Sequence, residues 1–357
     1  MSKVSELSEL SKVRSCAAVV AALLALGLAA CGTSDEAATG PADENCVVGS
    51  AITGRAPRIV ATVAPITSLV AQVVGAVGAS VVGLVPEGTN SHTFEPPPSA
   101  AAVLEQADVV FMNGLVLEEP TKDLARANMR EESIFCELGT AILPEAEWLY
   151  DFSFPKEGGK PNPHLWTNPP MAKQYAAVVL DVLSQLDPTN ADTYKNNFDV
   201  LVQQIGELDA AMAEATLTIP AGARLLLTYH DAYAYFAKHY GWTVVGAIQP
   251  SSFDEPTPKD VVDLIAQVRE QQVRAIFGSE VFPSSILEQI GAETGTRYID
   301  VLRDDDLPGA AGDELHSWQG LMHFNFITMV EALGGDATAL RTLNMKLLVV
   351  DSARYTQ

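Results

Sequence analysis

Apolar segments typical of buried strands alternate with segments of helical periodicity along most of this chain. RIVATVAPI (58–66) and SVVGLVP (80–86) resemble strands, and TSLVAQVVGAVG (67–78) between them has helical spacing. Two further strand-like segments follow, ADVVFMNG (107–114) and SIFCELG (133–139). Strands that alternate with helices predict a parallel sheet, and hence an α/β fold.

A helical stretch interrupts this alternation once. Residues 169–215 are rich in helix formers, and Asp187-Pro188 breaks the pattern. The alternation then resumes, with strand-like segments at 223–230, 242–249, 273–280 and 296–302. The pattern therefore predicts two α/β lobes of similar size on either side of a helical segment.

The N-terminal end has the features of an export signal. Lys3, Lys12 and Arg14 precede an uninterrupted apolar run, CAAVVAALLALGLAA (16–30). Fifteen residues are short for a membrane span, which needs about 20, and fit a signal-peptide core. The run ends in Leu28-Ala29-Ala30-Cys31, which resembles the bacterial lipobox and predicts lipidation of Cys31; the alternative is a plain signal peptide with a chance cysteine.

These patterns predict five regions. Residues 32–56, rich in Gly, Ala, Ser, Thr and acidic residues, are typical of a flexible spacer. We expect a lipoprotein signal peptide (1–30), a flexible tether (31–56), an N-terminal α/β lobe (57–168), a helical linker (169–215) and a C-terminal α/β lobe (216–357).

Charge and cysteine content narrow the function further. The formal net charge is −23, which disfavours binding to nucleic acid or anionic lipid and favours cations. An exported protein folds in an oxidising compartment, and Cys46 and Cys136 are the cysteines left besides Cys31 and the signal. They either pair as a disulfide or stay separate thiols, since Cys46 lies in the expected tether.

Candidate metal ligands lie at the expected strand ends. His230, Glu280 and Asp300 each follow an apolar strand of the second lobe, where open α/β sheets bind ligands. His92 and His164 lie in proline-bounded loops, VPEGTNSHTFEPPP (85–98) and KPNPHLWTNPP (160–170), which orient an imidazole at low entropic cost. Three histidines and a carboxylate are suitable for a first-row divalent metal.

Several of these segments together resemble one protein family, the zinc- and manganese-type solute-binding lipoproteins of bacterial ABC importers. The resemblance covers the chain from about residue 58 onward. The segments, in family order, are VPEGTNSHTFEP (85–96), ADVVFMNGLVLE (107–118), NPHLWTNP (162–169), LTYHDAYAYFAKHYG (227–241), IFGSEVFPSS (276–285) and YID (298–300).

The resemblance implies two Rossmann-like lobes with parallel sheets, joined by one long rigid helix, with the metal between the lobes. It implies His92, His164, His230 and Asp300 as metal ligands, with Glu280 as an outer partner or an alternative ligand. The chain departs from the family pattern in reading Asp300-Val301-Leu302 where Asp-Ser-Leu is usual. The run Asp304, Asp305 and Asp306 is interpreted as solvated loop.

The predicted function is a lipid-anchored, extracytoplasmic metal receptor, a monomer that passes its ion to an ABC permease in the cell membrane. The ion is transported cargo, zinc rather than manganese, although residues 141–163 lack the histidine-rich loop of many zinc-specific members. No catalysis is expected. The alternatives are a zinc hydrolase that uses the three histidines and a lipoprotein adhesin on the same fold.

Overall fold

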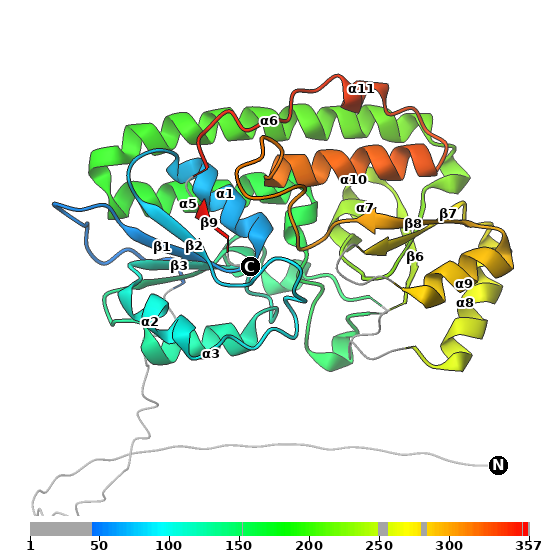
Figure 1. Cartoon of the computed structure of the whole chain (residues 1–357), viewed down its shortest axis with the longest axis horizontal. Helices are drawn as coiled ribbons and strands as arrows, with labels where there is room; N and C mark the ends of the chain where they lie inside the picture. Colours follow the sequence, from blue (N-terminus) through cyan, green and yellow to red (C-terminus); the bar gives the residue numbers. More distant parts are fainter. Residues whose placement is uncertain (1–44, 152, 249–255, 280–283, 352, 356–357) are drawn as a thin grey trace, which may run out of the picture. The chain divides into compact units, whose positions relative to one another are not determined.

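The computed structural model of the chain describes residues 45–151, 153–248, 256–279, 284–351 and 353–355. Two parallel sheets organise these residues (Figure 1). The strand order is β4-β3-β1-β2-β9 in the first sheet and β6-β5-β7-β8 in the second, and the strand pairings among the described residues are all parallel. The predicted α/β fold with two parallel sheets is confirmed.

Helices cover both faces of the first sheet, so its strands are apolar on both sides. Ile59 and Ala61 of β1 pack in the same core as α1, whereas Val60 packs with residues of α2 and α3. This two-sided burial explains the continuous apolar runs in the sequence. The elements of this N-terminal lobe are β1 (Arg58–Ala61), α1 (Ala64–Val74), β2 (Ser80–Gly83), α2 (Ser99–Gln106), β3 (Val109–Met112), α3 (Glu119–Asn128), β4 (Ile134–Glu137) and α4 (Leu138–Ile142).

The second sheet is built in the same way. Ile276 of β7 packs in the core with α8 and α9, and Phe277 faces the opposite core. Thr257 begins α8 through a capping box with Asp260, as its position before Pro258 predicts. The elements of this C-terminal lobe are β5 (Leu225–Thr228), α7 (Ala234–Tyr240), β6 (Thr243–Ala247), α8 (Pro258–Gln271), β7 (Ala275–Ser279), α9 (Ser285–Thr294), β8 (Arg297–Leu302) and α10 (Trp318–Ala332).

One long helix connects the lobes. The predicted helical linker consists of α5 (Pro169–Leu186) and α6 (Ala191–Thr218), with a short 3-10 turn at Pro188 between them. α5 packs against α1 and α4, whereas the 28-residue α6 packs against both α1 and α10 (Figure 1). The expected long helix between the lobes is therefore α6.

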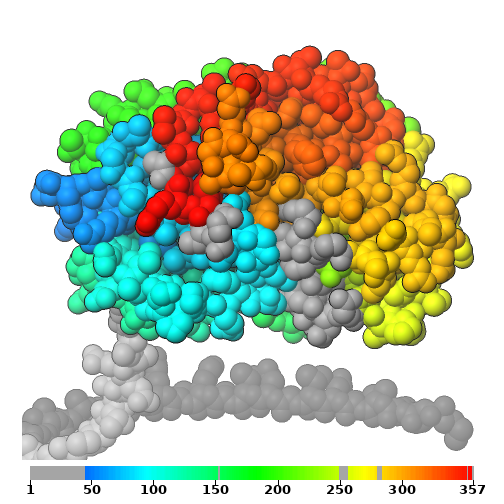
Figure 2. Space-filling model, in the orientation of Figure 1, coloured from blue at the N-terminus to red at the C-terminus, as the bar shows by residue number. Residues whose placement is uncertain are grey.

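The C-terminal segment returns from the second lobe to the first sheet, which the sequence did not predict. After α10 comes α11 (Thr338–Arg341), and β9 (Ala353–Arg354) pairs with β2. Gln204 of α6 donates from Nε2 to the backbone oxygens of Asn344 and Lys346. Figure 2 shows this red segment beside the orange segment that precedes α10. The lobes are thus linked twice, through α6 and through this segment.

No helix among the described residues is both long and apolar enough to cross a bilayer. The expected signal peptide and Cys31 lie outside the described residues.

The start of the described chain is fixed to β4. Cys46 and Cys136 form a disulfide in this structure, with Cα atoms 4.2 Å apart. Beside it, Cys46 N donates to Phe135 O, and Asn45 exchanges two hydrogen bonds with the backbone of Glu137. The tether is therefore attached at the edge of the first sheet.

We predict that Cys46→Ala lowers the free energy of unfolding of the mature protein by about 2–4 kcal/mol, because the bond closes a long loop in the unfolded chain. Urea titration followed by circular dichroism measures this change. Reductant should destabilise the wild type but leave Cys46→Ala unaffected. Equal unfolding midpoints for Cys46→Ala and the wild type, both measured without reductant, would contradict the prediction.

Candidate metal centre

Three histidines reach one point from three loops. His92 lies between β2 and α2, in a turn where its backbone N–H donates to Asn90 Oδ1. His164 immediately precedes the 3-10 turn Leu165–Thr167, and His230 follows β5 by two residues. His92 and His230 thus come from the carboxyl ends of strands in different sheets, where parallel sheets present ligand sites.

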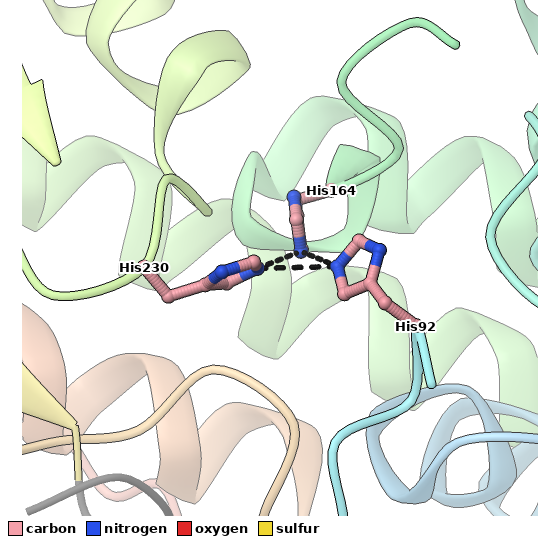
Figure 3. A group of neighbouring side chains, drawn as sticks. All are labelled: His92, His164 and His230. Carbon is pink, nitrogen blue, oxygen red and sulfur yellow. Dashed lines mark hydrogen bonds between the residues drawn. The ribbon is translucent and has the colours of Figure 1, made fainter. Parts of the chain in front are cut away.

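The imidazole nitrogens converge closely. The Nε2–Nε2 distances are 3.1 Å for His92–His164, 3.1 Å for His92–His230 and 2.9 Å for His164–His230 (Figure 3). Zinc bound tetrahedrally by such nitrogens would hold them about 3.3 Å apart. Among the described residues these three alone form a potential metal-binding group of three or more side chains. A few tenths of an ångström of outward movement would admit an ion.

Asn162 fixes the orientation of His164. Its Oδ1 lies 2.8 Å from His164 Nδ1, so the ring carries its proton on Nδ1 and directs the Nε2 lone pair to the centre. Asn162 Nδ2 in turn donates to the backbone oxygen of Asp231 and to Asp151 Oδ2. Such outer contacts raise the basicity of a metal-binding imidazole and hold it in place.

The surroundings favour the neutral forms of His92 and His164. Burial, followed by the neighbouring His230 and Lys160, lowers the pKa of His92 well below its ordinary value. Burial, followed by His230 and His92, does the same to the pKa of His164. Neutral imidazoles coordinate metals, whereas imidazolium ions do not. The site is therefore prepared for a cation at neutral pH.

Asp300 does not lie where the sequence interpretation placed it. β8 continues through Val301 to Leu302, so Asp300 is inside the strand rather than at its end, and it is exposed. The interpretation of Asp304 and Asp305 as solvated loop was wrong, since these residues are only 5 % and 7 % exposed. The carboxylate at the true end of β8 comes from this run.

Asp305 is the buried carboxylate of this run that holds the loop of His92. Its Oδ2 accepts from Ser91 Oγ at 2.6 Å, beside His92, while its Oδ1 is buried without a hydrogen-bond partner among the described residues. Burial, followed by the charge of Asp304, raises the pKa of Asp305 to about 7, and His230 opposes the increase. A buried acceptor of this kind is suited to a cation.

Other contributors were missed or cannot be placed. Phe154 lies over the site, with its ring centroid 5.8 Å from that of His92 and 5.9 Å from that of His164. Asn113, near the end of the strand-like segment 107–114, donates from Nδ2 to Pro163 O and so supports the His164 loop. Only a search for polar residues after a buried strand would have found Asn113. Glu280 lies outside the described residues.

Most of the chain matches one known protein family. Residues 59–332 match the sequence model of a family described as "Zinc-uptake complex component A periplasmic". The chain belongs to this family. It is therefore a metal-binding, substrate-binding component of an ABC transporter, and not an enzyme.

The family includes proteins named for different metals. The iron-binding protein YfeA of Yersinia pestis is 27% identical over 277 residues, 78% of this chain and 86% of that protein. The manganese-binding lipoprotein MntA of Halalkalibacterium halodurans is 26% identical over 322 residues, 89% and 98% of the two chains. The fold matches the periplasmic zinc-binding protein TroA of Treponema pallidum, with a TM-score of 0.70, 24% identity and coverage of 78% and 99%.

We predict that Asn162→Ala lowers metal affinity about 10- to 100-fold, because His164 loses the contact that fixes its tautomer and direction. Isothermal titration of the metal-free protein measures the change. Asn128→Ala, remote from the site and bonded to Leu124 O in α3, serves as the control. Unaltered affinity in Asn162→Ala would show that the orientation of His164 does not depend on this amide.

Proposed function

We propose that this protein is a lipid-anchored extracytoplasmic zinc receptor that delivers the ion to a cognate ABC permease. The observation that supports the proposal best is the triangle of Nε2 atoms at 2.9–3.1 Å. Neutral imidazoles would replace the water of the ion, and the ion leaves unchanged as cargo. The hydrolase alternative is excluded by family membership.

We further propose Asp305, in place of Asp300, as the fourth ligand. The carboxylate lies within electrostatic reach of His230, and its Oδ1 has no hydrogen-bond donor among the described residues. Three nitrogens and one oxygen form the tetrahedral set that zinc accepts readily.

The donor set favours zinc over the other metals for which relatives are named. Manganese prefers oxygen ligands and lies lowest in the divalent affinity series, with iron next to it. A nitrogen-rich, four-ligand site therefore discriminates against manganese more strongly than against iron. His92 is partly exposed, so the ion would enter and leave on its side of the site.

Binding of zinc should exceed binding of manganese by about 100-fold or more at pH 7.5, as the divalent series implies. Competition titrations of metal-free protein, with elemental analysis of the product, test the function directly. Absence of tight binding for any divalent ion would refute the receptor function. Equal affinity for zinc and manganese would refute the zinc assignment alone.

The pH dependence should reflect Asp305 first. With its pKa near 7, the carboxyl binds a proton as the pH falls, and zinc must displace that proton. Affinity should therefore fall about fivefold between pH 7 and 6, and about tenfold per pH unit below pH 6. The lowered histidine pKa values delay imidazole protonation to lower pH. A constant zinc affinity from pH 7.5 to 5.5 would contradict this assignment.

Replacing the two candidate carboxylates separates them. Asp305→Ala should lower zinc affinity about 100-fold or more, since loss of a direct ligand exceeds the effect of an outer contact. Asp300→Ala should bind like the wild type, because Asp300 is exposed within β8. The opposite ranking in the same titration would restore Asp300 as the ligand.

The anchor is proposed from the LAAC sequence at Cys31 and from relatives named as lipoproteins. Cys31→Ser should release the protein from membranes or block its processing. Fractionation of expressing cells, with mass spectrometry of the N-terminal peptide, measures both effects. Membrane association that is identical in the variant would contradict lipidation at Cys31.

A further inference from the structure

The three histidines are not held in the same way. His164 and His230 are tied together, since Asn162 Nδ2 and Thr167 Oγ1 donate to the backbone oxygens of Asp231 and Ala232. These contacts join the loop of His164 to the residues that follow His230. His92 belongs to a separate loop, and so its distance from the other two depends on what holds that loop.

The loop of His92 is clasped by the segment that follows β8. Gly88 N donates to both carboxylate oxygens of Asp306, at 2.7 and 2.8 Å. In the opposite direction, Leu307 N donates to Glu87 Oε1 at 3.3 Å. Adjacent residues on each loop thus exchange hydrogen bonds across the two lobes. We call this pair of contacts, Gly88–Asp306 and Leu307–Glu87, the clasp.

The clasp joins the loop of His92 to a charged side chain. A charged acceptor gives one of the stronger hydrogen bonds in proteins, and Asp306 is only partly exposed. An ion bound by all three histidines leaves most directly when His92 moves away from the tied pair. Gly88 lies four residues before His92 in the same loop, so that movement carries Gly88 away from Asp306.

We propose that Asp306 is a positioning residue that holds His92 against the other ligands and slows dissociation of the ion without touching it. The inference rests on the proposed function. Asp305, which also accepts from Ser91 Oγ beside His92, would bind the ion directly, whereas Asp306 would affect only how long the ion stays. Neighbouring carboxylates would therefore have separable effects on the same site.

The test is stopped-flow release of cobalt or zinc from the full mature protein into excess chelator. Asp306→Ala should release the ion about tenfold faster, with association nearly unchanged. Asp306→Asn keeps an oxygen acceptor for Gly88 N and should restore most of the slow release. Asp199→Ala, which removes an exposed aspartate of α6 paired with Lys195, is the matched control.

Further measurements keep the outcome decisive. The cobalt absorption spectrum should be unchanged in Asp306→Ala and altered in Asp305→Ala. Should Asp306→Ala fail to fold, Glu87→Ala removes the reciprocal bond and should also accelerate release. A folded Asp306→Ala or Glu87→Ala that releases the ion as slowly as the wild type would overturn the proposed role of the clasp. A changed cobalt spectrum in Asp306→Ala would also overturn it, because Asp306 would then affect the coordination of the ion. A wild type that binds no divalent ion would refute the proposed function itself.

Discussion

The convergence of three buried imidazole nitrogens is the constraint around which the rest of the site is arranged. Nitrogens about 3 Å apart repel each other when the rings are protonated. Burial, and then the charge of the neighbouring histidines, lowers the pKa values of His92 and His164. The fold sustains this arrangement because parallel sheets bring the carboxyl ends of distant strands to one edge. A cation is the partner that satisfies all three nitrogens at once.

Contacts away from the metal centre hold the two lobes together. Away from the histidines, α6 packs against both lobes, Trp318 N donates to Ser68 Oγ, and Gln319 and Gln72 exchange hydrogen bonds between α10 and α1. The C-terminal segment adds a second connection through β9, beyond residue 332, where the family match ends. Buried polar pairs and a doubled connection resist large rotations, so the lobes should move through small displacements at the loops near the metal centre.

Much of the fold, and the three histidines that converge, could be predicted from the sequence. Alternating apolar runs identified both sheets because each strand is covered on both faces, and His92, His164 and His230 stood out in stiff loops or at a strand end. The burial of Asp304 and Asp305 was misjudged because three consecutive aspartates are usually solvated. Asp305 is buried by tertiary contacts, chiefly with Ser91, which is 214 residues away in sequence, and no local pattern reports such a contact. The two-residue β9 likewise has too little periodicity to recognise.

Charge balance connects the acidic run to the choice of ion. A divalent cation held by neutral imidazoles and one carboxylate retains one positive charge in a buried place, which is costly without compensation. Asp304 lies buried next to Asp305, and its backbone oxygen accepts from Trp166 Nε1, so its position is fixed. Burial, followed by Asp306, raises the pKa of Asp304 to about 6, and the positive charge of an arriving ion would favour its ionised form. With Asp305 as the proposed ligand, the two carboxylates would balance the charge of a divalent ion, whereas a monovalent ion would leave negative charge uncompensated. The two buried aspartates would in this way favour divalent cations over monovalent ones.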